Sequence, residues 1–177
     1  MSWSLEIFSP RDAQVKIEEV AGRLTRTTPP LALHSEVKDG TEAQTQEAWD
    51  TLVLSEASGV PRVMGSVQSI LFASEREADP QLLGLFEAEI VASDAEDGTL
   101  DDEYTDRLRK TLEETRWHYV ISVQQNSRPE QERAVVLTTN ALAHASGGIV
   151  HDLQTGAWMD ADLFEILLDA YGVCDTI

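Results

Sequence analysis

Cysteine is almost absent from this chain: among its 177 residues there is one, Cys174. A single cysteine excludes a disulfide within the chain and favours a reducing compartment. A lone cysteine near the end of a chain is typical of a small apolar filler rather than of a nucleophile.

Long apolar runs are missing as well. No uncharged apolar run approaches the roughly 20 residues that cross a bilayer. The first residues, MSWSLEIFSPRDAQ, lack both a basic stretch and a long apolar segment, so we expect no signal peptide. These absences predict a cytoplasmic protein without a membrane-spanning helix.

Basic residues are scarce. The chain has 13 Lys and Arg against 32 Asp and Glu, a formal net charge of −19. No base occurs from Glu77 to Asp106, where there are eleven acids, and none follows Arg133, where there are six. Such an excess repels nucleic acid and anionic lipid and attracts cationic surfaces, so we expect neither of the first two as a partner. Solubility alone, or a salt-adapted host, is the other interpretation of this charge.

Motifs of common catalytic sites are missing too. There is no G-x-S-x-G elbow, no G-x-x-x-x-G-K-[ST] loop and no G-x-G-x-x-G turn. Carboxylates are so numerous that no pair of them stands out as a glycosidase pair. We therefore expect no enzyme activity, no cofactor and no metal.

Helical signals are present in five places. Ser9, Thr99 and Ser127 each offer a hydroxyl that could cap a helix, with an acid shortly after it. Apolar residues at helical spacing follow each of these starts, and similar spacing predicts helices over 160–171 and, less regularly, over 42–56.

Strand signals lie between the helices. Apolar and polar residues alternate over 3–7, 86–90 and 117–123, the stretch 65–74 is rich in strand-forming residues, and 147–159 predicts two short strands around a turn. No linker divides the chain, so we expect one domain over 1–177. The sequence predicts an α+β fold: a mostly antiparallel or mixed sheet with about four to five helices packed on it.

Two acidic patches are candidate partner-binding surfaces. Residues 93–106 carry seven carboxylates, but Ala95 and Tyr104 stand where a calcium loop needs oxygen ligands, so we predict a negative surface instead. The second patch combines an aromatic side chain with acids, which suits a protein interface; packing of this Trp under the last helix is the alternative. The predicted partner-binding residues are Asp94, Glu96, Asp97, Asp101, Asp102, Trp158, Asp160, Asp162 and Glu165.

Histidines provide an alternative function. His151 and Asp152 spell a dipeptide of metal-dependent phosphohydrolases, and His144 lies on the other side of a glycine pair, so a small metal-dependent hydrolase is one alternative. Otherwise we expect His144 to interact with the carbonyls at a helix end. His118 falls on the polar side of its strand and is expected to be exposed.

The stretch 117–159 has a strand, an Ala-rich helix and the motif G-G-I-V-H-D-L-Q-T-G. This pattern, over about a quarter of the chain, resembles bacterial immunity proteins of polymorphic and contact-dependent toxin systems. The resemblance implies a cytoplasmic protein that binds and neutralises a cognate toxin, and it carries over no inhibitory residue. Many such toxins are basic, so a charge of −19 would speed association. An acidic adaptor or chaperone for a secreted effector is the remaining alternative.

Overall fold

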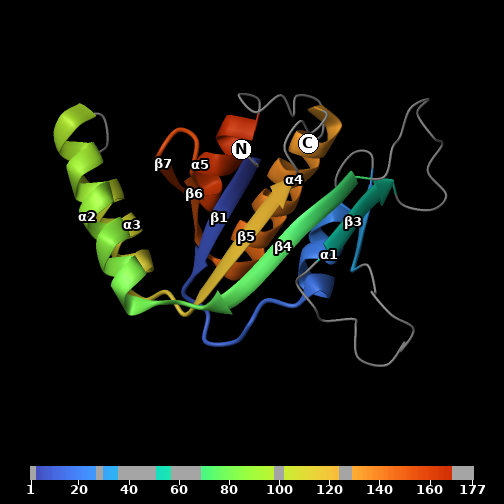
Figure 1. The fold of residues 1–177 in the computed structure, drawn as a ribbon, viewed down its shortest axis with the longest axis horizontal. Coiled ribbons are helices and arrows are strands. Elements are labelled where there is room, and N and C mark those ends of the chain that lie inside the picture. Colours follow the sequence, from blue (N-terminus) through green and yellow to red (C-terminus); the bar gives the residue numbers. More distant parts are fainter. Residues whose placement is uncertain are drawn as a thin grey trace.

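A seven-stranded antiparallel sheet organises the molecule (Figure 1). The computed structural model describes residues 3–26, 30–35, 51–56, 69–97, 102–123 and 129–168. In sheet order the strands are β2 (Leu31–Ser35), β3 (Thr51–Glu56), β4 (Ser69–Glu77), β5 (Trp117–Val123), β1 (Trp3–Ser9), β6 (Ile149–Asp152) and β7 (Ala157–Asp160). Every neighbouring pair is antiparallel. The helices are α1 (Ile17–Leu24), α2 (Pro80–Asp97), α3 (Asp102–Glu113), α4 (Pro129–Ser146) and α5 (Ala161–Ile166). The predicted α+β fold is confirmed.

One face of the sheet carries the main hydrophobic core. In β1, Leu5 and Ile7 point to this face because side chains alternate along a strand, and both are fully buried. Helices α1, α4 and α5 cover the face, as Figure 1 shows for α4 behind β1, β5 and β4. Val20, Leu142 and Phe164, one from each helix, are fully buried in the same cluster.

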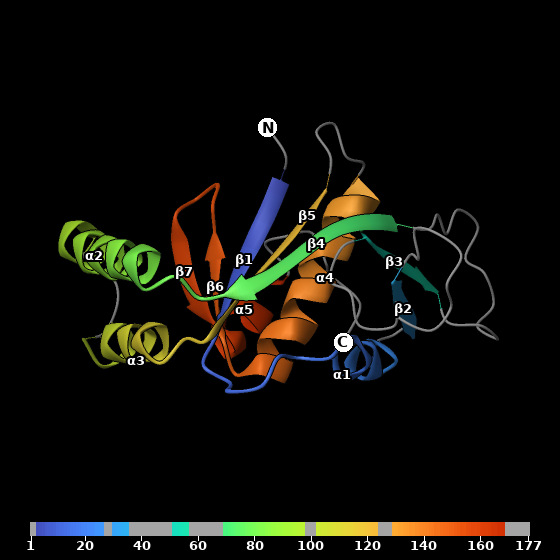
Figure 2. The same ribbon diagram turned by 60° about the horizontal axis from the view of Figure 1, so that its bottom comes forward.

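The opposite face carries a second, smaller core beneath α2 and α3, which lie side by side (Figure 2). We call this helix pair the arm. Apolar side chains of the arm pack against one large side chain from each of three strands: Phe8 of β1, Ile149 of β6 and Trp158 of β7. The arm is therefore attached by its two chain connections, to β4 and β5, and by this patch of apolar contact.

Of two helix predictions near the amino end of the chain, the first has the wrong start and the second is wrong where the structure describes it, although Ile17, Val20 and Leu24 of the first do form the buried face of α1. Ser9 does not start a helix: it is the last residue of β1, its Oγ accepts a hydrogen bond from the Arg11 N–H, and α1 begins only at Ile17. The chain between them forms no helix and bends at Asp12 and Ala13, and the Val15 N–H donates to the Tyr119 hydroxyl at 2.8 Å. Of the helix predicted over 42–56, the end is strand β3 and the rest lies outside the described residues.

The strand predicted over 86–90 is part of helix α2. Leu83, Phe86 and Ile90 are spaced three and four residues apart and form the face of α2 that packs on the small core, whereas Ala88 is exposed. The sequence 86–90 therefore fits two patterns. Phe86, Ala88 and Ile90 alternate with acids as in a strand, but Phe86 and Ile90 also have the spacing of one helix face. Within the described residues, no helix is both long and apolar enough to cross a membrane.

The predicted helix, strand, turn and strand near the carboxyl end are confirmed, but α5 ends at Ile166, and the rest of the helix predicted over 160–171 lies beyond residue 168, outside the described residues. Helix α4 ends before Gly147, whose φ of +62° is the left-handed conformation that glycine adopts readily after a helix. Strands β6 and β7 follow with a turn between them, and Gly156 in that turn also has a positive φ. Asp160 caps α5 by accepting the Leu163 N–H at 2.8 Å.

Candidate functional site

The structure places the first predicted acidic patch on the arm. Three of its five acids lie at the end of α2: Asp94, Glu96 and Asp97. Asp102 begins α3, and Asp101 lies outside the described residues. Residues 80–113 contain ten acids and three bases. Two of these bases are already engaged, because Arg107 lies 3.7 Å from Glu103, and Arg109 lies 2.9 Å from Glu87 and 3.6 Å from Asp106. The arm therefore bears a large share of the net negative charge.

The second acidic patch adjoins the arm. The backbone N–H of Asp160 donates to the Tyr104 hydroxyl at 2.9 Å, which holds the first turn of α3 beside the start of α5. Asp162 is exposed there, and Glu165 lies 2.8 Å from Nε2 of His144. The two patches that the sequence offers as alternatives thus meet at Tyr104.

Trp158 is not an exposed anchor, so this prediction is wrong. Its side chain is 6% exposed because β7 pairs with β6 and turns the ring towards α2. The ring stacks on His151 with centroids 4.0 Å apart and planes at 7°, and it also contacts Phe8 and Phe86. Trp158 serves the small core and offers no free face to a partner.

A buried carboxylate beneath the arm was missed by sequence reasoning. Glu6 of β1 stands opposite His151 of β6 in the strand register, and its Oε2 lies 3.2 Å from Nδ1 of that ring. Its Oε1 lies 3.4 Å from Nε2 of His118, from the other neighbouring strand. The Glu6 side chain is only 12% exposed. Burial by itself raises the pKa of Glu6, but hydrogen bonds from His118 and His151 outweigh it and lower that pKa to about 2.

The two histidines have different partners on their far sides. His118 accepts a hydrogen bond at Nδ1 from Nε of Arg76 at 2.9 Å, so its proton is on Nε2, facing Glu6. His151 has Glu89 of α2 3.6 Å from its Nε2, so it lies between two carboxylates. The expectation that His118 is exposed is wrong: it is 1% exposed, stacked on Phe8 at 4.5 Å.

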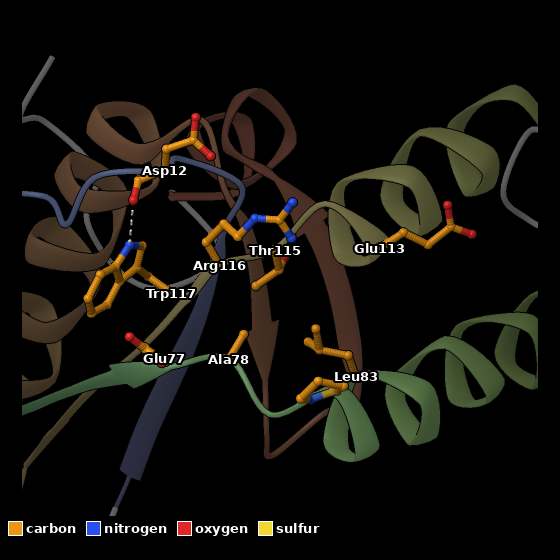
Figure 3. Close-up of a pocket in the computed structure, with 9 residues that line it drawn as sticks. Asp12, Glu77, Ala78, Leu83, Glu113, Thr115, Arg116 and Trp117 are labelled. Carbon is orange, nitrogen blue, oxygen red and sulfur yellow. Dashed lines mark hydrogen bonds between the residues drawn. The ribbon is translucent and has the colours of Figure 1, made fainter.

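An open cleft lies at the root of the arm, where α2 and α3 join β4 and β5 (Figure 3). It has a volume of about 430 Å³, within the range of ligand sites. The indole of Trp117 stands on one side, with its N–H donating to the Asp12 carbonyl at 3.3 Å, and Leu83 stands on the other.

Charge in this cleft is unbalanced. Asp12, Glu77 and Glu113 line it together with one base, Arg116. All four are exposed, and within the described part of the chain none of them forms an ion pair. Unpaired carboxylates in a concave site attract a cation more strongly than the same groups on a flat surface.

The residues of the hydrolase alternative do not come together. His151 and Asp152 are neighbours in β6 and so face opposite sides of the sheet. The Asp152 carboxylate accepts the Gln154 N–H at 2.9 Å and thereby stabilises the turn after β6. His144 belongs to α4 and lies against Glu165. In the described ranges, no group of three His, Cys, Asp or Glu side chains is placed to hold a metal ion.

Comparison with known proteins yields no relative. No protein-family model, no curated protein and no solved structure matches this chain.

Proposed function

We propose that this chain is an immunity protein that binds a basic bacterial toxin through its acidic surface and blocks it in the cytoplasm. The observation that carries the proposal is the cleft at the root of the arm. A Lys or Arg side chain of a toxin would meet the carboxylates of Asp12, Glu77 and Glu113 there, next to the indole of Trp117. Carboxylates and an aromatic face are the two groups that hold such cations in protein interfaces.

The net charge supports the same proposal. A formal charge of −19 raises the rate at which a cationic protein finds this chain, because long-range attraction steers the encounter. An inhibitor benefits from this speed, since it must reach the toxin before the toxin reaches its target. The resemblance of residues 117–159 to immunity proteins adds to this support.

The test uses the toxin encoded beside this gene in its native host, purified as a catalytically inactive variant for binding and as the active form for inhibition. We expect tight binding, loss of toxin activity in the complex, and an association rate at least about tenfold lower in 0.5 M than in 0.05 M salt. An association rate that does not change with salt contradicts the steering. A partner that stays active in the complex, or that this chain carries and then releases in active form, favours the alternative of an adaptor or chaperone.

A pair of double variants tests the cleft. Glu77→Gln with Glu113→Gln removes two carboxylates of the cleft, and Glu18→Gln with Glu132→Gln removes two exposed carboxylates from α1 and α4. We expect the first pair to weaken toxin binding about 10- to 100-fold and the second to change it less than about threefold. Equal effects of the two pairs would show that only total charge matters.

A further inference from the structure

Helix α2 has apolar side chains on two sides, and the fold buries only one of them. Leu83, Phe86 and Ile90 pack into the small core. Leu85 is 69% exposed, and Leu82 is half-buried without belonging to either core cluster. A helix that covers a sheet needs one apolar stripe, so the second is not explained by folding.

The second apolar stripe has an acidic border. Leu82, Leu85 and Glu89 are spaced three and four residues apart, so they share one flank of α2. Glu89 is 46% exposed and reaches Nε2 of His151 from this flank. Helix α2 contains five acids and no base. The flank therefore combines two apolar side chains with the carboxylate of Glu89, on a helix that carries no base, and such a mixture of apolar and charged groups suits a protein interface.

We propose that this flank is a docking face for a basic amphipathic segment of a partner protein. The apolar side of that segment would cover Leu82 and Leu85, and a Lys or Arg side chain of the segment would reach Glu89. The inference rests on the proposed function, because the partner it describes is the basic toxin. It adds an apolar anchor to a surface otherwise defined by charge.

Charge decides between the possible occupants of this flank. A second copy of the chain would bring another formal charge of −19 against the acids of α2. An anionic membrane would be repelled for the same reason. A basic protein segment is attracted by the same acids that repel a second copy or an anionic membrane, and it can also cover the exposed Leu85.

The test uses two synthetic peptides, so it does not depend on the toxin. One is an 18-residue amphipathic helix of Leu and Lys, and the other replaces each Leu by Gln at the same charge. The full chain is titrated against each labelled peptide by fluorescence anisotropy. We expect the Leu/Lys peptide to bind at least about tenfold more tightly than the Gln/Lys peptide.

Substitutions at Leu85 separate an apolar contact from charge. Both Leu85→Glu and Leu85→Lys should weaken the Leu/Lys peptide by about tenfold, because each removes the apolar anchor. The matched control is Leu153, which is 49% exposed in the turn between β6 and β7; Leu153→Glu and Leu153→Lys should change binding less than about twofold. Circular dichroism and the urea midpoint check that all four variants remain folded.

Two results would overturn the inference. The first is equal affinity of the two peptides, and the second is tighter binding by Leu85→Glu, since either means that charge alone attracts the peptide. Toxin binding is measured separately. If the chain binds no toxin but prefers the Leu/Lys peptide through Leu85, the docking face stands and the proposed function fails. If it binds the toxin without sensitivity at Leu85, the function stands and the docking face fails.

Discussion

Glu6 gives the sharpest prediction, because its carboxylate is buried between two imidazoles and its pKa falls from 4.5 to about 2. That difference corresponds to about 3 kcal/mol of unfolding free energy. The contribution is fully present above pH 4.5, where the unfolded chain also has an ionised Glu6, and it disappears as the pH falls towards 2. Integrating between these values, about 2 kcal/mol is lost by pH 3.

The assay compares the wild-type chain with Glu6→Gln by urea unfolding from pH 7 to pH 3. At pH 7 we expect the variant to be less stable by about 3 kcal/mol, because His118 and His151 lose a buried anionic partner. The gap between the two proteins should shrink to about 1 kcal/mol at pH 3. The other acids titrate in both proteins, so they cancel from the difference. A gap that stays constant over this pH range would refute the reasoning.

Four further substitutions test single positions. Gly22→Ala in the exposed part of α1 should stabilise the chain by about 0.5–1 kcal/mol, since a Cβ there meets nothing within 4 Å. Gly147→Ala should destabilise the chain by about 1 kcal/mol, because the φ of Gly147 is +62°. Urea midpoints measure both changes. Trp158→Ala should lower the free energy of unfolding by about 3–5 kcal/mol in the same assay, because the ring is buried in the small core. A loss below about 1 kcal/mol would mean that Trp158 does not hold the arm against the sheet. Burial raises the pKa of Tyr119 to about 12, so absorbance at high pH should show a late ionisation of a tyrosine that Tyr119→Phe removes. The stability that this group contributes is present below pH 10 and is lost as the pH rises towards 12.

The elements that the sequence predicts correctly are those in which local pattern and burial agree. In β1 and β5, one side of each strand faces the main core, so apolar and polar residues alternate clearly. Helix α4 ends at a glycine that takes a left-handed conformation, which is a local signal. Helix α2 lacked such agreement, because it is apolar on two sides, and helical and strand spacing both fit it.

The candidate sites could not be predicted because they depend on strand register and on which face the arm covers. Glu6, His118 and His151 are 112 and 33 residues apart in the chain, and only the order β5-β1-β6 brings them together. The cleft collects residues from before α1, the end of β4, the start of α2, the end of α3 and the start of β5. Trp158 illustrates the same limit: the acids around it in sequence indicated a surface, and the arm that buries it lies at least 45 residues earlier in the chain.

The interior position of β1 has a consequence for biosynthesis. This strand is synthesised more than 100 residues before either of its sheet neighbours, because Ser9 pairs with Trp117 and Leu5 pairs with Asp152. At roughly 5–20 residues per second, both of its edges remain without their native partners for about 5 to 25 seconds. During that interval the nascent chain exposes a strand that is ready to pair with the wrong neighbour, so its yield in the cell should depend on chaperones that hold unfinished chains.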